Sequence, residues 1–379
     1  MSTSAPSPAA RSVLVVGAGP AGLSAAISLR QHGAEVVDVA EIADHRAVIG
    51  SELSVASPML RALDRIGVAR AIAAGGIAIG EAQICLADGT LLGSVPFPPV
   101  AGPELPGTVG IARSVLHEVL WSAAEAAGAR LRPGAGVTGL EAGEPVVASF
   151  ADGSQASYDL VVGADGVRST VRDLMFPDAP APWYSGQIAW RARVPRRTGP
   201  LLAVYNAADR KAGLITVSGT DSYLFLLVST PEPGRPRRED FPALLRSALA
   251  CFGGPVAEIR DDITDPAAIH YSPLNPVLVP APWHRGRVVL IGDAAHATTP
   301  HLAYGAGLAV EDGIILGEML AGAPDVETAL KAFTDRRWER CRMVVENGLQ
   351  IQRWEIEGPG AGDQAGLTMR SQMAIGQPA

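Results

Sequence analysis

The hydrophobic pattern of the first forty residues predicts a strand, a helix and a second strand. SVLVV at 12–16 is a short β-branched run of the kind that forms a buried parallel strand. The glycine-rich turn GAGPAG at 17–22 leads into a helical stretch at 23–32, and a second strand near 36–40 ends at Glu41. About 30 residues in this order are typical of a βαβ unit.

Helical and strand patterns alternate in the next part of the chain. Apolar residues recur with helical spacing at 58–74 and 113–127, and LVV at 160–162 is typical of another buried strand. Asp-Gly pairs at 88–89 and 152–153 lie between short apolar runs. These pairs predict β-hairpins, because Asp-Gly supplies the positive φ of tight turns.

The pattern changes again in the second half of the chain. Residues 187–229 contain successive strand-like runs joined by turns, which predicts an antiparallel sheet. A helix at 241–250 and a proline-rich stretch follow, and a buried strand at 287–291 precedes two helices near 305–321 and 326–347. Elements of the parallel-sheet type thus come from both ends of the chain, and the strand-rich middle is interpreted as an insertion.

Composition excludes several classes of function. Among 379 residues, 47% are hydrophobic and 18% are charged, which is enough to form a sizeable core. The formal net charge of −8 argues against binding to nucleic acid or to an anionic membrane. Cys85, Cys251 and Cys341 are far apart and odd in number, and the seven histidines form no metal-binding spacing. Neither a disulfide framework nor a metal centre is expected.

The ends of the chain have the composition of tails. Residues 1–11 are small and polar without an apolar stretch, so a disordered tail is expected and not a signal peptide. The glycine-rich segment from residue 349 to residue 379 is also expected to be a tail. No run reaches the ~18 apolar residues of a membrane-spanning helix. The protein is therefore predicted to be cytoplasmic, with no membrane insertion.

The turn after the first strand has the pattern of a dinucleotide-binding motif. Gly17 allows the tight turn, Gly19 lets a pyrophosphate approach the backbone, and Gly22 lets the helix pack closely on the strand. Ala21 lies in the first turn of that helix, whose free N–H groups attract phosphates. Glu41 is placed to accept hydrogen bonds from ribose hydroxyls. These features alone do not separate FAD from NAD.

Two later segments carry a resemblance to a known family. LVVGADGVRSTVR occupies 160–172, and VVLIGDAAHATTP at 288–300 is followed by GAG at 305–307. With the first glycine motif, these segments resemble the single-component FAD-dependent aromatic hydroxylases, the family that includes para-hydroxybenzoate, salicylate and 6-hydroxynicotinate hydroxylases. The resemblance extends over residues 12–345, and the three motifs occur in the family's order.

The resemblance implies a fold class and a domain organisation. The expected class is α/β, a Rossmann-like FAD-binding domain with an inserted, mostly antiparallel β-sheet substrate domain. Residues 12–180 and 285–348 would form the discontinuous FAD-binding domain, with minor strands of the substrate domain interleaved. Residues 181–284 would form the substrate-binding sheet.

The resemblance also implies which residues hold FAD. Asp293, beside Gly292, would bind the ribityl chain, although an N-cap is the alternative role for this carboxylate. Arg113 matches an arginine that contacts FAD in the family, with an exposed surface charge as its alternative. The remaining implied contacts lie in the later loops: Asp165, Gly166, Pro300, Gly305, Ala306 and Gly307. Arg168 and Arg172 are equally compatible with a cofactor role and with plain surface charges.

The sequence departs from the family pattern in two places. Ile42 follows Glu41 where the family usually has a basic residue, and Arg46 is the candidate substitute. GSELS at 50–54 replaces a Gly-Ala-Gly-hydrophobic segment, so Glu52 is unusual and is predicted to face outward. Some relatives place a histidine base where Ser54 falls, so the family's base cannot be transferred to this chain.

The implied activity is aromatic hydroxylation. NADH or NADPH would reduce the FAD, O₂ would form a flavin C4a-hydroperoxide, and a small phenolic or N-heteroaromatic substrate would take the hydroxyl group. Candidates for a catalytic base are Tyr223, His301 and Tyr304, and candidates for substrate contact are Trp190, Arg191 and Ser54. Each of these also has an ordinary role in a core or loop as its alternative. A monomer or a homodimer is expected.

Three rival functions are weighed against hydroxylation. A flavin-dependent halogenase usually shows W-x-W-x-I-P, whereas WRARVP at 190–195 lacks the second tryptophan. A non-catalytic escort protein of the same fold would not need the intact Gly292-Asp293 pair. A plain NAD-dependent dehydrogenase would need a Tyr-x-x-x-Lys or an equivalent, and neither Lys211 nor Lys331 completes that motif. Because there is a single dinucleotide motif, a separate nicotinamide domain is not expected.

Overall fold

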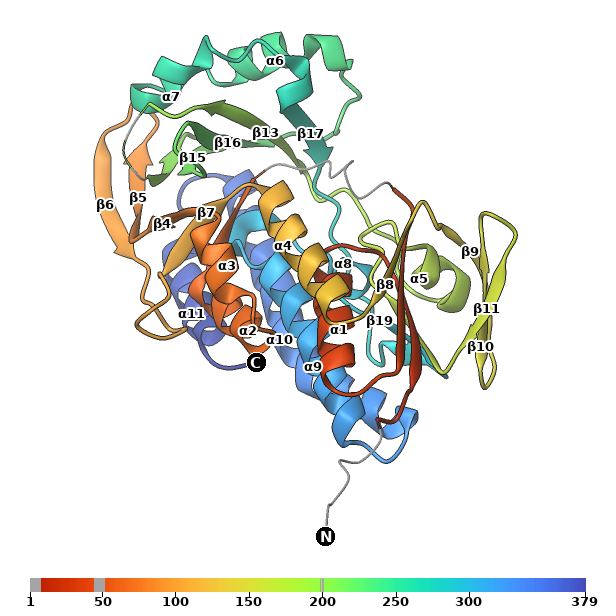
Figure 1. Cartoon of the computed structure of the whole chain (residues 1–379). Helices are drawn as coiled ribbons and strands as arrows, with labels where there is room; N and C mark the ends of the chain where they lie inside the picture. The colour runs from red at the N-terminus through yellow and green to blue at the C-terminus, as the bar shows by residue number, and fades with distance from the viewer. Residues whose placement is uncertain (1–7, 44–51, 198, 200) are drawn as a thin grey trace.

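The computed structural model describes residues 8–43, 52–197, 199 and 201–379. Figure 1 shows a layered body of helices around a parallel sheet, with a larger sheet and two short helices at one end. The predictions for residues 1–7 of the N-terminal tail, for residues 50–51 of the GSELS segment and for Arg46 lie outside the described residues.

The described strands form four sheets, each named below in its hydrogen-bonded order. The cofactor-type sheet consists of β18 (His284–Arg285), β19 (Val288–Leu290), β12 (Leu160–Gly163), β1 (Ser12–Val16), β2 (Val36–Glu41) and β8 (Arg130–Pro133). The seven-stranded sheet consists of β17 (Ile269–Pro273), β13 (Gln187–Pro195), β16 (Asp221–Ser229), β15 (Arg210–Thr216), β14 (Leu202–Asn206), β5 (Glu81–Leu86) and β6 (Leu91–Pro96). The two three-stranded sheets are β11 (Gln155–Tyr158), β10 (Val146–Phe150) and β9 (Val137–Glu141), and β3 (Leu53–Ala56), β7 (Thr108–Ile111) and β4 (Ile77–Ile79).

Helices alternate with these strands and make up most of the C-terminal part of the chain. The α-helices are α1 (Pro20–Gln31), α2 (Ser57–Arg65), α3 (Ala69–Ala74), α4 (Arg113–Ala126), α5 (Thr170–Met175), α6 (Phe241–Ala248), α7 (Gly254–Arg260), α8 (Asp293–His296), α9 (Gly305–Gly322), α10 (Val326–Glu357) and α11 (Gln364–Gly376). Short 3₁₀ turns are η2 (Arg238–Asp240), η3 (Pro266–Ala268) and η4 (Pro300–Leu302).

The cofactor-type sheet brings distant loops to one edge. Strands β19, β12, β1, β2 and β8 are parallel, and only β18 among the described strands of this sheet runs the other way. Parallel strands bury both faces, which is why β1 and β12 are continuous apolar runs. The glycine turn, Glu41, and the loops after β12 and β19 therefore meet at the carboxyl edge, where open α/β sheets bind their ligands.

Helices α1 and α9 pack closely because small residues separate them. A Cβ on Gly313 would lie 2.5 Å from the Ala25 nitrogen, and a Cβ on Gly317 would overlap Ser28. The Ser28 hydroxyl uses this closeness to donate a hydrogen bond to the Ile314 carbonyl at 2.9 Å. In Figure 1 the two helices lie side by side through the middle of the molecule. This contact positions the start of α9 beside the glycine turn.

The seven-stranded sheet separates two environments. Trp190, Leu224 and Leu226 face a buried cluster with Leu245 of α6 and Val256 of α7, the helices that cover the outer face. Residues at alternate positions lie on the opposite face, toward the rest of the molecule. Among the described strands of this sheet, only β14 and β5 pair in parallel. The predicted α/β class with an inserted, mostly antiparallel sheet is confirmed.

Both predicted tails need correction where the structure describes them. Ala10 is buried, and the Ala9 amide donates to the Leu320 carbonyl at 3.0 Å, so residues 8–11 pack on the body. Residues 349–379 are not a loose tail, because α10 continues to Glu357 and α11 packs against it. Ser371 and Ile375 are the buried residues of α11, whereas Met369 and Met373 are exposed, so the sequence shows no clear apolar pattern there.

The helical pattern at 58–74 is interrupted in the structure. Helix α2 ends at Arg65 and α3 begins at Ala69, with Gly67 at φ +78° between them. Glycine adopts this conformation without a steric penalty, so it allows the break.

None of the helices in the described part of the chain combines the length and the apolar composition needed to cross a membrane.

Candidate active site

The glycine turn forms a cradle that side chains would fill. Gly17 has φ +104°, and a Cβ there would lie 2.5 Å from the Ala164 carbonyl oxygen. A Cβ on Gly22 would overlap the Gly17 carbonyl, whereas a Cβ on Gly19 would meet no atom within 4 Å. No side chain caps the N-terminus of α1. The turn therefore offers free helical N–H groups and open space to an anionic ligand.

Glu41 closes one side of this cradle. Its carboxylate accepts hydrogen bonds from the amides of Ala18 at 2.8 Å and Ala43 at 3.0 Å. Position 41 is the last residue of β2, next to β1 in the sheet, so the carboxylate reaches the glycine turn directly. On another side, His117 of α4 contacts the Ala18 carbonyl through Nε2 at 3.1 Å. The sequence motif thus brings its acid to the turn, whereas no sequence pattern predicts the contact of His117.

The loop after β12 is organised by its own carboxylate. Asp165 accepts from the Ser169 hydroxyl at 2.5 Å and from the Val171 amide at 3.0 Å, so it supports Ser169, the N-cap residue of α5. Gly166 has φ +79° and open space around its Cβ position. Arg172 is buried and donates to the Ala294 and Val167 carbonyls at 3.0 and 2.8 Å. Arg172 is therefore not a surface charge, because it ties this loop to the loop after β19.

Asp293 is the exposed member of a buried run. Gly292, Ala294 and Ala295 are buried, whereas the Asp293 side chain projects from the carboxyl edge of the sheet. Desolvation by the surrounding protein raises the pKa of Asp293, and the positive charges of His296 and Arg113 act against that rise. Arg113 is exposed at the first residue of α4. An acceptor and a cation thus face the same side of the cradle.

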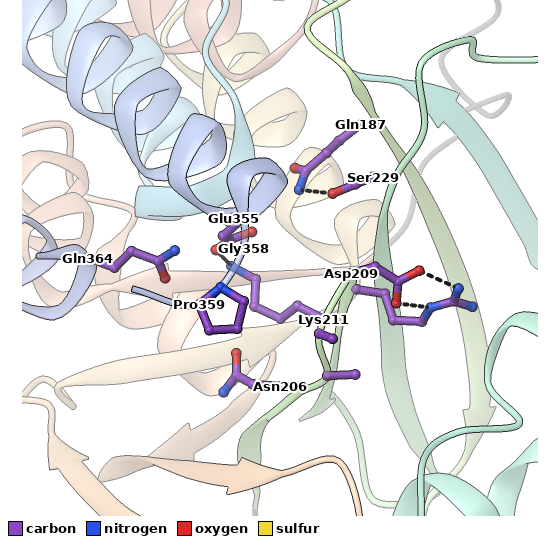
Figure 2. A pocket seen from close by; sticks show the side chains of 12 residues that line it. Gln187, Asn206, Asp209, Lys211, Ser229, Glu355, Gly358, Pro359 and Gln364 are labelled. Carbon is purple, nitrogen blue, oxygen red and sulfur yellow. Dashed lines mark hydrogen bonds and ion pairs between the residues drawn. The ribbon is translucent and has the colours of Figure 1, made fainter. Parts of the chain in front are cut away.

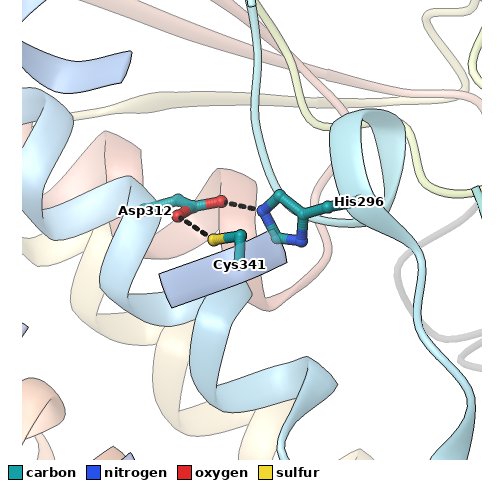
Figure 3. A group of neighbouring side chains, drawn as sticks. All are labelled: His296, Asp312 and Cys341. Atoms are coloured by element: carbon teal, nitrogen blue, oxygen red, sulfur yellow. Dashed lines mark hydrogen bonds and ion pairs between the residues drawn. The ribbon is translucent and has the colours of Figure 1, made fainter. Parts of the chain in front are cut away.

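A charge network lies directly beneath the Gly292-Asp293 turn. Figure 3 shows His296 and Cys341 around Asp312. One Asp312 oxygen accepts from the Gly292 amide at 2.9 Å and contacts His296 Nε2 at 2.6 Å, and the other accepts from Arg337 Nε at 2.7 Å. Burial acts to raise the pKa of Asp312, but His296 and Arg337 hold it at about 2. The network anchors the turn from below.

The same three side chains could be mistaken for a metal centre. Ligand atoms of His296, Asp312 and Cys341 all lie within 4.8 Å of one another. However, Arg337 already occupies one oxygen of Asp312. Burial acts to lower the pKa of His296, but Cys341 and Asp312 raise it well above its ordinary value. Both oxygens of Asp312 are thus already engaged within the protein, one by His296 and the other by Arg337.

The loop from Thr299 to Tyr304 contains a strained residue. Ala303 has φ +51°, and it is the one non-glycine residue with positive φ in the described part of the chain. L-residues lose about 1–2 kcal/mol in this conformation, and it persists only where the surroundings impose it. The Gln372 amide of α11 donates to the Leu302 carbonyl at 2.9 Å and holds the loop from outside. The loop leads into α9, where Gly305, Ala306 and Gly307 form the first helical turn.

Replacing Ala303 by glycine is expected to raise the free energy of unfolding. Glycine removes the steric penalty at φ +51° but adds unfolded-state entropy, so the net gain should be up to about 1 kcal/mol. Urea denaturation measures it. The matched control is Ala332→Gly, an exposed position inside α10, which should lose about 0.5–1 kcal/mol. Equal losses for both variants would contradict the assignment of strain.

Tyr304 does not face the substrate side. Its hydroxyl donates to Glu311 at 2.7 Å, and Glu311 in turn pairs with Arg337 and Arg340. Burial and the Glu311 charge raise the pKa of Tyr304 well above its ordinary value. The prediction of Tyr304 as a catalytic base is therefore wrong. The cause is the close approach of Gly307 to its ring, which seats the side chain between α9 and α10.

His301 is buried with both ring nitrogens engaged. Nδ1 lies 3.0 Å from the Thr299 hydroxyl and Nε2 lies 3.2 Å from Glu355 of α10. Glu355 also pairs with Lys211 of β15 at 2.5 Å. Burial lowers the pKa of His301, and although burial acts to raise the pKa of Glu355, bonds to His301 and Lys211 hold it at about 2. His301 thus joins the loop to the Glu355 carboxylate, and its role as a catalytic base stays a prediction.

Glu355 is expected to contribute a pH-dependent part of the stability. Its pKa lies below the ordinary value of 4.5, so the contribution is complete above pH 4.5 and is lost as the pH falls toward about 2. Glu355→Gln should cost about 2–3 kcal/mol near neutral pH, because Lys211 loses its charged partner. Urea denaturation of both proteins at several pH values gives the difference. A difference that does not shrink between pH 4.5 and pH 2 would contradict this role.

Alternation along β13 and β16 decides which candidates face inward. Trp190 packs edge-on against Phe241 at a ring distance of 5.2 Å, on the outer face of the sheet. The prediction of Trp190 as a substrate contact is therefore wrong. Arg191 lies on the opposite face and donates to the Ser272 hydroxyl at 2.8 Å. Tyr223 shares that inner face and packs beside Phe225 at a ring distance of 6.1 Å.

Glu52 is buried, which corrects the prediction that it faces outward. Its side chain is 5% exposed and accepts from Arg193 Nε at 2.7 Å. Arg193 is on the same face of β13 as Arg191, so the pair joins the segment before β3 to the sheet. Ser54 lies in β3, half-buried and opposite Gly110 of β7. The unusual acid in the family motif was the only sequence signal for this contact, because its partner Arg193 lies 141 residues further along the chain.

A polar pocket of about 240 Å³ lies where the seven-stranded sheet meets the end of α10 (Figure 2). Lys211, Asn206 and Gln187 line it from the sheet, and Glu355 lines it from α10. None of these residues belongs to a motif of the sequence. A weak signal exists for Lys211, since it is one of only two lysines in the chain.

Comparison with known proteins agrees with this geometry. The chain matches the family model described as FAD binding domain over residues 10–348. It is 32% identical over 359 residues to the putative FAD-dependent monooxygenase YetM of Bacillus subtilis, covering 93% of this chain and 96% of that protein. It is 31% identical to the 2-heptyl-3-hydroxy-4(1H)-quinolone synthase of Pseudomonas aeruginosa, covering 90% of each. The structure of Klebsiella pneumoniae HpxO complexed with FAD and uric acid superposes with a TM-score of 0.81 at 26% identity, covering 96% of this chain and 92% of that one.

Proposed function

Because this chain belongs to the FAD binding domain family and is an FAD-dependent monooxygenase, we propose that it uses NADH or NADPH and O₂ to hydroxylate a small aromatic substrate. The substrate class is phenolic or N-heteroaromatic. Since the reaction consumes a reduced nicotinamide nucleotide, the proposed location is the cytoplasm, and the proposed assembly is a monomer or a homodimer.

One observation carries the FAD assignment. Three loops that are far apart in sequence meet at the carboxyl edge of one parallel sheet, and each offers a group that FAD requires. The turn at Gly17–Gly22 offers helical N–H groups to a pyrophosphate, and Glu41 offers a carboxylate to the adenosine ribose. Asp293 offers an outward acceptor to the hydroxyls of a ribityl chain. These residues fit FAD in full, and the further contacts proposed are those expected from the sequence: Ala21, Arg113, Asp165, Gly166, Gly292, Pro300, Gly305, Ala306 and Gly307.

The protein's own residues orient the bound cofactor and stabilise negative charge on it. When bound, FAD supplies the redox chemistry of the reaction. The first turn of α9 presents the free N–H groups of Gly305–Gly307 and the positive end of the helix dipole, which stabilise an anion placed there. Asp312 and Arg172 fix the loops on either side of Asp293. These bonds hold the turn that carries Asp293 in place from both sides.

The substrate is proposed to lie between the Pro300 loop and the inner face of the seven-stranded sheet. Tyr223 and Phe225 supply aromatic surface there, and Arg191 supplies a cation. Ser54 approaches from β3. Of the three candidate bases, Tyr223 keeps that role in this proposal. A halogenase is disfavoured, because Trp190 of the half-met tryptophan motif packs into the outer core.

Turnover under ¹⁸O₂ tests the proposal. A set of phenols and hydroxypyridines is incubated with the FAD-loaded protein and NADH or NADPH, and products are analysed by mass spectrometry. The expected product carries one ¹⁸O atom. Oxidation of the nucleotide that yields only hydrogen peroxide with every compound tested would contradict hydroxylation of these classes.

A further inference from the structure

The pocket at the end of α10 contains a buried amide with an unused acceptor. Gln187 is 2% exposed, and its Nε2 donates to the Ser229 hydroxyl at 3.3 Å. Its Oε1 is buried with no hydrogen-bond partner. In Figure 2 this oxygen points away from Ser229, toward the side where α10 ends. A buried carbonyl oxygen without a partner is rare in folded proteins, and in a pocket it marks a place for a donor.

The charges around the pocket are already balanced. Lys211 pairs with Glu355, and Arg210 pairs with Asp209. A ligand that fits this pocket is therefore uncharged, because a net charge would have to break one of these pairs. Lys211 has three N–H donors and uses one on Glu355, so it can also donate to a ligand oxygen. A complementary ligand is therefore a neutral group that carries both an N–H donor and a carbonyl acceptor.

The pocket belongs to the same face of the sheet as the substrate side. Gln187, Ala189 and Arg191 alternate along β13, so their side chains share one face. On the neighbouring strands, Leu227 and Lys211 pair directly on that face. From Lys211, the contacts through Glu355 to His301 lead to the Pro300 loop. A substrate lying along this face would have aromatic and apolar walls toward the loop from Thr299 to Tyr304 and polar partners at Gln187.

We propose that this pocket binds a neutral lactam-type group of the substrate, with Gln187 Oε1 accepting from the ring N–H and Lys211 donating to the carbonyl. The inference rests on the proposed function and narrows its substrate class to N-heteroaromatic compounds that carry N–H and C=O. Glu355 keeps Lys211 in place and is a positioning residue in this arrangement.

Isothermal titration calorimetry of the FAD-loaded protein with 2-quinolone and with 1-methyl-2-quinolone measures the two dissociation constants and tests the proposal. The second compound lacks only the N–H donor. Wild-type protein is expected to bind 2-quinolone about tenfold more tightly, the effect of one buried hydrogen bond. Gln187→Met, which keeps the length of the side chain but has no acceptor oxygen, should remove this preference. The matched control is Gln155→Met, because Gln155 makes the same amide-to-serine bond on an exposed strand, at 3.0 Å to Ser149.

Each outcome decides the matter. Equal binding of the two compounds by wild-type protein, no binding of either, or a preference that survives in Gln187→Met would overturn the inference. The titration contains no nicotinamide nucleotide, so it is independent of turnover. If NADH or NADPH oxidation is stimulated by aromatic compounds while the quinolone pair shows no difference, the lactam subsite fails and the proposed function stands. If the quinolone pair shows the expected difference but no aromatic compound stimulates oxidation of NADH or NADPH, the proposed function fails and the lactam subsite stands.

Discussion

Asp293→Ala is expected to weaken FAD binding by about 100-fold while the protein remains folded. The carboxylate projects from an otherwise buried turn, so its loss leaves the core untouched. Hydrogen bonds to a charged acceptor contribute about 1.5–3 kcal/mol each, and about 2.7 kcal/mol corresponds to a factor of about 100. Fluorescence titration of the apoprotein with FAD measures the dissociation constant, and circular dichroism reports the fold.

Two further variants separate the cofactor role from a general effect of charge. Asp293→Asn keeps one acceptor oxygen and should fall between wild type and Asp293→Ala. Asp335→Ala removes an exposed carboxylate from the surface of α10 and should leave FAD affinity unchanged. Full FAD retention by Asp293→Ala would refute the placement of the ribityl chain at this turn.

Arg337→Met is expected to lower the free energy of unfolding by about 3–5 kcal/mol. Arg337 is fully buried and pairs with Asp312 at 2.7 Å and with Glu311 at 2.9 Å. Removing one partner of a buried ion pair leaves uncompensated charge, which is the costly case. Because Asp312 also holds the Gly292 amide, the variant should lose FAD affinity as well. Urea denaturation of the apoprotein isolates the structural effect.

The neighbouring residue provides the control for this prediction. Arg336 lies on the surface of the same helix, and its Nη1 atom is 3.9 Å from a carboxylate oxygen of Glu318. Exposed pairs of this kind contribute about 0–1 kcal/mol, so Arg336→Met should change stability little. If Arg337→Met also stayed within about 1 kcal/mol of wild type, the network beneath the Gly292-Asp293 turn would not anchor that turn.

Local patterns predict the elements that position the cofactor. The β-branched run of β1, the glycines of the first turn and Glu41 are all adjacent in sequence or within one βαβ unit, so their geometry follows from chain connectivity. The Asp-Gly hairpins at 88–89 and 152–153 are predictable for the same reason, because a tight turn is decided by the residues within it. The FAD-binding assignments for individual residues stay predictions until tested.

Long-range contacts explain the predictions that are wrong. Trp190 and Arg191 point to opposite faces of β13, and the sequence does not show which face meets the helices α6 and α7. Glu52 finds its partner Arg193 across 141 residues, and Glu355 joins His301 to Lys211 from the end of α10. Such pairs depend on how separate sheets meet, which no local pattern contains.

Anaerobic reduction of the bound flavin is the most direct test of whether this chain is a nicotinamide-dependent aromatic hydroxylase. The purified, FAD-loaded protein is titrated with NADH and then NADPH while the flavin absorption bands are followed, with and without each aromatic compound. The expected result is slow bleaching by one nucleotide alone and faster bleaching when an aromatic substrate is present. A protein that binds no FAD after reconstitution, or whose flavin neither nucleotide reduces under any of these conditions, would contradict that function.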